Sequence, residues 1–236
     1  MNLPLNPATH PHAPLELARF NMIEQQIRPW NVFDGHILDV LGRVRREDFV
    51  PTAYRSLAFM DIQIPLRGNA EEALIKGECM LSPKIEARLL QDLQITRNDR
   101  VLEIGAGSGF MAALLAQMAD QVVSLEIEPE LAAMAQDNLR RAGVRNAAVR
   151  VADGARGLIP DGPFDVILLS GSVAAVPQEL LALLRDGGRL AAVVGEDPMM
   201  RATFVRRHGE RFDTTQPWDT VVPRLRNFPE PSGFQF

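Results

Sequence analysis

The sequence has little cysteine, and this excludes one kind of stabilisation. Cys79 is the only cysteine among 236 residues, so no disulfide can form within the chain. The four histidines do not approach the spacing of zinc ligands, and we expect no metal site. A chain of this length buries about 70–75% of its unfolded surface and needs neither a disulfide nor a metal to fold. The cysteine count suits a reducing compartment, and we expect a cytoplasmic protein.

Excess positive charge and long apolar runs are also absent. The 25 Lys and Arg residues are outnumbered by 30 Asp and Glu residues, which gives a net charge of -5. Nucleic acids and anionic membranes both attract basic surfaces, so we expect neither as a partner. No run approaches the roughly 18 uncharged apolar residues of a membrane span, and the first fifteen residues lack the pattern of a signal peptide.

The composition that is present is typical of a globular protein, with 46% hydrophobic and 23% charged residues. The pattern along the chain divides it into four parts. We expect a flexible tail over 1–15, a helical cap with a substrate loop over 16–96, a core over 97–195, and C-terminal strands over 196–236. The chain contains no internal repeat, and nothing in the sequence predicts its oligomeric state.

The first helix of the cap is predicted from apolar spacing. Phe20, Ile23 and Ile27 recur at intervals of three and four residues, as on one face of a helix. Pro14 can occupy the first turn of this helix, and Pro29 should end it.

Two more helices are predicted in the cap, separated by a loop. Asp34 can cap a helix that carries Ile37, Leu38 and Leu41. Residues 61–79 have no clean period and should form a loop. A third helix begins at Ser82-Pro83, with Ser82 as the N-cap and Glu86 reaching back to it.

From residue 100 the chain alternates between strands and helices. Strands that are spaced by helices form a parallel sheet with right-handed connections, so the fold class is α/β and doubly wound. Two further strands without a helix between them predict an antiparallel edge. The expected strands are 100–104, 121–126, 147–151, 164–169, 189–194, 203–207 and 220–225, and the expected helices are 108–118, 129–141 and 177–185.

The most informative segment is the glycine-rich turn after the first strand of the core. Gly105, Gly107 and Gly109 allow a tight turn to which a ligand can approach closely. A dinucleotide site would have the spacing G-x-G-x-x-G, but the third position of that pattern holds Phe110. Glu103 would be poorly placed beside a pyrophosphate and well placed near an ammonium or sulfonium group. A nicotinamide oxidoreductase is therefore disfavoured.

The spacing E-x-G-x-G-x-G after a strand resembles motif I of Rossmann-like methyltransferases that use S-adenosyl-L-methionine (SAM). Glu126, at the end of the second strand, matches the acidic residue that binds the ribose hydroxyls, a role that suits a carboxylate. Asp153-Gly154 matches the position near the adenine. The resemblance implies a cofactor site made of Glu103, Gly105, Ala106, Gly107, Gly109, Glu126, Ile127, Asp153, Gly154 and Ser170.

A narrower resemblance covers roughly residues 20–227. The chain is similar to the protein-L-isoaspartate O-methyltransferases, which implies methyl transfer from SAM to the carboxylate of an isoaspartyl residue in protein, with S-adenosyl-L-homocysteine as the product. The segments that carry the resemblance are Glu24-Gln25, Ile27-Arg28, Val44 to Pro51, Leu102 to Gly109, Asp153 to Gly157, Pro163 to Ile167 and Leu184 to Leu190.

The chain departs from that family on the acceptor side. Alignment of the prolines places Leu81 where the family has the Ser or Thr that contacts the substrate carboxylate, and only Ser82 offers a hydroxyl nearby. Lys84 takes the place of a histidine, and loop 67–76 is longer than usual. After the fourth strand, Ser170-Gly171-Ser172 replaces an Ala-rich stretch. Lys84 is expected to pair with a carboxylate or to be solvated.

Other side chains have mainly structural interpretations. We expect the arginines 43, 45 and 46 to lie at a solvated helix end. Cys79 is not expected to act as a nucleophile, because no histidine is near it in the sequence.

Four functions follow from these patterns. The first is an isoaspartyl methyltransferase, and the second is a divergent relative that methylates another acceptor. The third is a SAM-binding module without turnover, and the fourth is the disfavoured nicotinamide enzyme.

Overall fold

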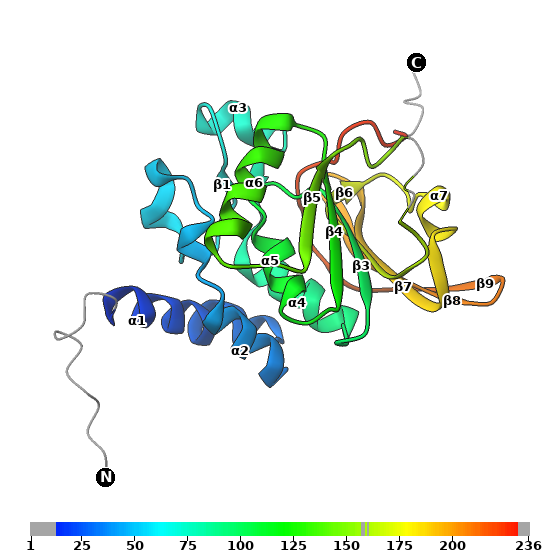
Figure 1. The fold of residues 1–236 in the computed structure, drawn as a ribbon, viewed down its shortest axis with the longest axis horizontal. Helices are drawn as coiled ribbons and strands as arrows, with labels where there is room; N and C mark the ends of the chain where they lie inside the picture. The colour runs from blue at the N-terminus through cyan, green and yellow to red at the C-terminus, as the bar shows by residue number, and fades with distance from the viewer. Residues whose placement is uncertain (1–12, 157–158, 160, 231–236) are drawn as a thin grey trace, which may run out of the picture.

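The computed structural model describes residues 13–156, 159 and 161–230. Its centre is a seven-stranded sheet with the order β5-β4-β3-β6-β7-β8-β9 (Figure 1). Strands β3 to β7 pair in parallel, and β8 and β9 continue the sheet antiparallel. This confirms the predicted α/β class and the antiparallel edge. The strands are β3 (Arg100–Ile104), β4 (Gln121–Glu126), β5 (Ala147–Val151), β6 (Phe164–Val173), β7 (Leu184–Glu196), β8 (Met199–His208) and β9 (Arg211–Asp219).

The prediction of a last strand over 220–225 is wrong. The chain turns at Gly209, and β9 returns along β8 as an almost fully exposed edge strand. Its polar sequence carries no apolar alternation, because neither of its faces is buried. In the described segment after β9, the one isolated bridge joins Arg224 to Ser172 of β6.

Helices cover the two faces of the sheet unequally. The helices α4 (Pro83–Leu93), α5 (Phe110–Ala116) and α6 (Pro129–Arg141) lie on one face, together with the N-terminal cap (Figure 1). The other face is covered by the short helix α7 (Gln178–Leu181) and by Phe228. The helix predicted over 177–185 is shorter because β7 already begins at Leu184. The apolar core therefore has two parts, separated by the sheet.

The first helix of the cap differs from its prediction. Helix α1 (Ala13–Met22) continues into a π-helical turn η2 (Ile23–Ile27) and a 3-10 turn η3 (Arg28–Trp30). The predicted tail therefore falls outside the described residues except for 13–15, which lie in α1. Arg19, Ile23 and Ile27 form the buried row, at intervals of four. Phe20 is one position away from this row and is 58% exposed, contrary to expectation.

The second cap helix, α2 (Gly35–Arg43), is as predicted. The Asp34 carboxylate accepts hydrogen bonds from the backbone N–H groups of His36 and Ile37. Two 3-10 turns follow it, η4 (Arg46–Asp48) and η5 (Thr52–Leu57).

Residues 61–79 contain more structure than a loop. Strand β1 (Ile64–Pro65) pairs antiparallel with β2 (Cys79–Met80), and helix α3 (Ala70–Ile75) lies between them. Asn69 caps α3 by accepting from the N–H of Glu72 at 2.8 Å. An Asn followed three residues later by a Glu is a helix-start signal that the sequence contained. No helix among the described residues has the length and apolarity needed to cross a membrane.

Candidate active site

The glycine-rich turn lies at the carboxyl end of β3, where the order of the parallel strands reverses between β3 and β6. Ligands of open α/β sheets bind at such a switch point. The turn is fixed from below, because the N–H groups of Gly105 and Ala106 both donate to the carbonyl of Leu125, at 2.8 and 3.1 Å. Gly105 and Gly109 have φ angles of +95° and +82°, which side-chain-bearing residues rarely adopt.

Glu126 lies directly beside this turn. One of its carboxylate oxygens accepts from the N–H of Gly107 at 2.8 Å, and the other accepts from the N–H of Glu128 at 3.1 Å. The side chain is almost fully buried but lines a cleft in front of the turn, as does the neighbouring Ile127. A two-oxygen acceptor thus stands at the end of β4, where the sequence predicts it.

Asp153 and Gly154 reach the same cleft from the end of β5. The Asp153 carboxylate accepts from the N–H of Ala155 at 3.0 Å and from the side-chain amide of Asn227 at 2.8 Å. A Cβ atom on Gly154 would lie 2.4 Å from a methyl carbon of Ile104, so only glycine fits there. The structure therefore brings part of the implied cofactor set together in one cleft, whereas Ala106 and Gly109 do not line it. The residues that do are Gly105, Gly107, Glu126, Ile127, Asp153, Gly154 and Ser170.

The prediction that Glu103 lies near a ligand cation is not confirmed. Its side chain is completely buried beneath the turn, and its two oxygens accept from the hydroxyls of Ser124 at 2.6 Å and Ser170 at 2.8 Å. Burial raises the pKa of Glu103 to about 7, although both hydroxyls oppose the shift. These hydrogen bonds join β3, β4 and β6 beneath the turn, and Ser170 itself also lines the cleft.

The raised pKa of Glu103 predicts a pH effect on stability. A folded-state pKa above the ordinary value means that folding favours the protonated form, so stability falls as the pH rises from about 4.3 to about 7. Replacing Glu103 by Gln removes this loss. The variant should gain about 1–3 kcal/mol relative to wild type between pH 5 and pH 8, measured by urea unfolding. Parallel pH profiles of the two proteins would contradict the assignment.

Glu78 and Arg226, which line the cleft, belong to a network of ion pairs from distant parts of the chain. Arg67 donates to Glu78 at 2.6 and 2.8 Å, to Glu128 at 2.5 Å and to Glu130 at 2.6 Å. Arg226 donates to Glu128 at 2.7 Å. The hydrogen bonds from Arg67 hold the pKa values of Glu78 and Glu128 below their usual range. This ion-pair network joins the cap, the start of α6 and the C-terminal segment.

The volume of the cleft is small. The cleft encloses about 70 Å³, whereas ligand pockets typically have about 300–1,000 Å³. A nucleoside-sized ligand therefore needs more room than the cleft has in this conformation. Sequence reasoning missed Arg67, Glu78 and Arg226, because their partners lie up to 98 residues away along the chain.

The structure differs most from the sequence-based predictions on the acceptor side. Leu81 is buried in the apolar core, and its carbonyl accepts from the guanidinium of Arg46 at 2.7 Å. Ser82 precedes α4 but makes no capping hydrogen bond, and its buried hydroxyl has no partner. Glu86 does not reach back to Ser82, because it pairs with the fully buried Arg46. Arg46 is thus not part of a solvated helix end.

The side chain of Lys84 is partly buried and pairs with a carboxylate of the chain itself. Its ammonium lies 2.6 Å from the Asp61 carboxylate and 4.0 Å from the centre of the Trp30 ring. Cys79 lines the cleft, and burial raises the pKa of its thiol to about 12. A thiol with this pKa is protonated at neutral pH and is a poor nucleophile. Among the described residues, no three His, Cys, Asp or Glu side chains are grouped so that they could hold a metal ion.

Comparison with known proteins gives a consistent picture. Residues 18–221 match the family described as Protein-L-isoaspartate(D-aspartate) O-methyltransferase (PCMT). A protein-L-isoaspartate O-methyltransferase of Methanoculleus marisnigri is 39% identical over 182 residues, which cover 77% of this chain and 79% of the relative. One of Koribacter versatilis is 36% identical over 212 residues, which cover 89% and 92%.

A solved structure shows the same fold. A beta-aspartate methyltransferase (PCMT) from Plasmodium falciparum, crystallised in complex with S-adenosyl-L-homocysteine, superposes with a TM-score of 0.74. The superposition covers 88% of this chain and 98% of that chain, at 17% sequence identity. Likeness at this identity supports the arrangement of helices and strands alone.

Proposed function

The chain belongs to the protein-L-isoaspartate O-methyltransferase family, and we propose that it transfers the methyl group of SAM to the carboxylate of an isoaspartyl residue in a protein or peptide. The observation that carries this proposal is the sequence match over 18–221, which spans both the cap and the core. S-adenosyl-L-homocysteine is the second product.

The residues that line the cleft suit this cofactor in their chemistry. Glu126 presents a buried two-oxygen acceptor, which suits the two hydroxyls of a ribose. Gly105 and Gly107 of the turn offer backbone at close range, and Asp153 and Gly154 line the same cleft. We assign these residues and Ile127 to cofactor binding. Glu103 supports the turn from beneath, and Ser170, which donates to Glu103, also lines the cleft.

For this reaction the protein mainly has to position the methyl donor and the acceptor. Bound SAM supplies a methyl group on a sulfonium ion. An isoaspartyl carboxylate is ionised at pH 7, so the protein needs no general base. The chain's residues then hold two opposite charges in line and keep water away while they neutralise. The absence of a hydroxyl at Leu81 therefore affects acceptor binding rather than the displacement itself.

Glu126 provides a test of the cofactor site. Replacing it by Ala should weaken SAM binding by about 5- to 150-fold, because hydrogen bonds to a charged group contribute about 1–3 kcal/mol. Isothermal titration calorimetry measures the change. Asp137→Ala, which removes an exposed carboxylate on α6, is the matched control and should bind SAM as wild type does. An unchanged dissociation constant in Glu126→Ala removes Glu126 from the site.

The acceptor is tested with twin peptides. The purified chain is incubated with methyl-labelled SAM and a peptide that contains one isoaspartyl residue, or with its normal aspartyl twin. We expect label in the isoaspartyl peptide well above the twin. Equal labelling contradicts the proposed acceptor. No labelling by a chain that binds SAM favours another acceptor or a binding module without turnover, which the departures at Leu81 and Ser170-Gly171-Ser172 would then explain.

A further inference from the structure

The cofactor cleft has one fixed wall. The glycine-rich turn belongs to this wall, and the N–H groups of Gly105 and Ala106 both donate to the Leu125 carbonyl at the end of β4. Two segments outside the seven-stranded sheet form the other wall, the loop segment 66–78 and the C-terminal segment 224–228. The cleft encloses about 70 Å³, so a nucleoside-sized ligand enters only when a wall moves. The hydrogen-bonded strand ends are the less mobile wall.

The two segments differ in how their backbones are attached. The C-terminal segment is bonded to the sheet, because the N–H of Leu225 donates to the carbonyl of Ser172 in β6 at 2.9 Å. The backbone hydrogen bonds of the loop segment 66–78 in the described structure all lie within the segment itself. One example runs from the N–H of Leu66 to the carbonyl of Glu78 at 2.9 Å. The loop segment can therefore leave the sheet without breaking a backbone hydrogen bond.

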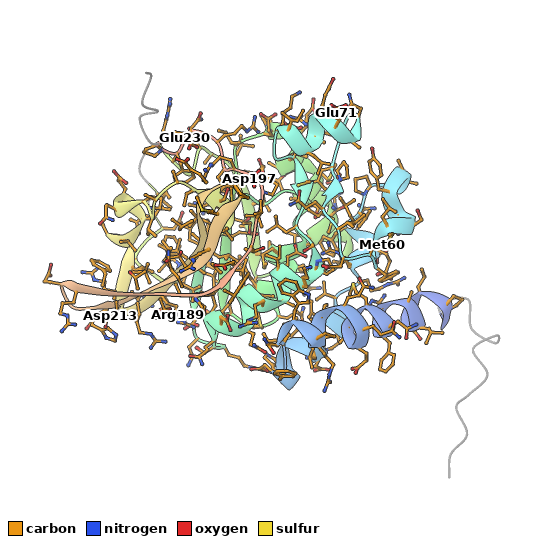
Figure 2. All side chains as sticks on the ribbon, turned by 180° about the vertical axis from the view of Figure 1, so that it is seen from behind. Met60, Glu71, Arg189, Asp197, Asp213 and Glu230 are labelled. Atoms are coloured by element: carbon orange, nitrogen blue, oxygen red, sulfur yellow. The ribbon has the colours of Figure 1, made fainter. Side chains whose placement is uncertain are left out.

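Helix α3, at the centre of the loop segment, buries little apolar surface. Ala73 is its one buried residue, whereas Leu74 is 40% and Ile75 is 78% exposed. Figure 2 shows α3, with Glu71, at the outer edge of the molecule. Segments with few buried apolar contacts open locally at a low cost in free energy. The loop segment is therefore the part of the movable wall that opens most easily.

Leu66 places the loop segment directly against the glycine-rich turn. Its side chain is almost fully buried, and its Cδ1 atom would lie 3.2 Å from a Cβ atom on Gly107. Gly107 lines the cleft, and its N–H donates to Glu126, the proposed ribose-binding residue. Movement of the loop segment away from the core removes Leu66 from the turn and widens the cleft at this point.

One arginine holds the loop segment against the core. Arg67 donates to Glu128 at 2.5 Å and to Glu130 at 2.6 Å, both at the start of α6. In the described part of the chain, the other ion pair between this segment and the rest joins Glu78 to Arg226, at the longer distance of 3.9 Å. The side chains of Arg67 and Glu128 are partly exposed and that of Glu130 is largely exposed. Ion pairs with this exposure are weak and break readily.

Arg67 keeps a partner when these ion pairs break. Its guanidinium donates to both carboxylate oxygens of Glu78, at 2.6 and 2.8 Å, and Glu78 belongs to the same segment. A bidentate pair of this kind is among the stronger charged hydrogen bonds, and it moves with the segment. Opening therefore costs only the two bonds to α6 and the packing of Leu66.

We propose that the loop segment 66–78 is a gate to the cofactor cleft, held closed by the hydrogen bonds from Arg67 to Glu128 and Glu130. This inference rests on the proposed function. SAM enters when Arg67 separates from α6 and Leu66 leaves the turn. Loop 67–76 is longer than the family usually has, and the gate gives this added length a role.

Two variants with opposite changes of charge test the gate. Arg67→Gln removes a positive charge and Glu128→Gln a negative one, so electrostatic attraction of the cationic SAM changes in opposite directions. The gate predicts faster association of SAM with both variants. The association rate should rise about 2- to 25-fold in Arg67→Gln, which loses two exposed ion pairs, and about 2- to 5-fold in Glu128→Gln, which loses one. Surface plasmon resonance with the immobilised chain measures these rates.

Further variants control for charge and for folding. Asp137→Asn, which removes an exposed carboxylate of α6 outside the ion-pair network, should bind SAM at the wild-type rate. Glu130→Gln is the mildest change, because Glu130 is 80% exposed, and should raise the rate less than Glu128→Gln does. Thermal unfolding reports whether each variant keeps its fold. Hydrogen exchange of the N–H groups of 66–78 should be faster in Arg67→Gln than in wild type.

The outcomes separate this inference from the proposed function. Wild-type association rates in Arg67→Gln and Glu128→Gln, or changes of opposite sign in the two, overturn the gate and leave the proposed function standing. A wild-type chain that does not bind SAM overturns the proposed function, and the inference with it.

Discussion

Replacing Glu86 by Gln should lower the free energy of unfolding by about 3–5 kcal/mol, the usual cost of leaving a buried charge unpaired. Arg46 is fully buried, and one of its Nη atoms donates to Glu86 while the other donates to the Leu81 carbonyl at 2.7 Å. Its guanidinium also lies 4.8 Å from the centre of the Phe110 ring. Gln keeps the shape of Glu86 but not its charge, and Arg46 cannot lose its own charge.

Burial raises the pKa of Glu86 to about 7, so urea unfolding of the variant and of wild type is compared at pH 8, where the carboxylate is mostly ionised. The matched control is the double variant Arg46→Met with Glu86→Leu, which removes both charges together. Replacing a whole buried ion pair by apolar residues is often neutral, so the double variant should be more stable than Glu86→Gln. A loss of less than about 1 kcal/mol in Glu86→Gln contradicts the assignment of a buried charged pair.

Replacing Gly105 by Val should weaken SAM binding by about 30- to 5,000-fold. The φ angle of +95° is strained for any residue with a side chain, and a Cβ there would lie 3.0 Å from Leu225 Cδ2 and 3.6 Å from the Ser170 carbonyl. Strain of about 1–2 kcal/mol and crowding of about 1–3 kcal/mol add to about 2–5 kcal/mol. In the free variant the turn relieves the strain by leaving its wild-type conformation. It must return to the wild-type conformation, at this cost, to bind the cofactor.

The matched control for Gly105→Val is Gly209→Val. Gly209 also has a positive φ, +60°, but no atom lies within 4 Å of the position of its Cβ. It sits in the turn between β8 and β9, away from the cleft. Gly209→Val should lose some stability and bind SAM as wild type does. Wild-type SAM affinity in Gly105→Val would show that the turn is not the cofactor cradle.

The cofactor side could be predicted from the sequence because its signals are local. The turn from Gly105 to Gly109 follows one strand and begins one helix, and the bounds of β4, β5 and α6 match the expected ranges. Glu126 and Asp153 stand at strand ends, and parallel strands bring their carboxyl ends to one edge of a sheet. The prediction that Glu103 faces the ligand is wrong, because spacing alone does not show where its carboxylate is buried.

The acceptor side could not be predicted because its partners are distant. Ser82 and Glu86 stand four residues apart, one more than in a capping box, and Arg46 pairs with Glu86 from 40 residues away. A buried guanidinium offers a carboxylate more than a helix N-terminus does, so the tertiary pair forms instead of the cap. Arg67 likewise binds Glu128 from 61 residues away, and no local pattern connects the two.

Equilibrium binding of SAM, compared with NAD and NADP, tests the central claim most directly. The account predicts saturable binding of SAM by the wild-type chain, loss of affinity in Glu126→Ala, and no binding of either dinucleotide at the same concentration. Failure of SAM to bind at up to millimolar concentration would contradict the account, whatever acceptor is tried.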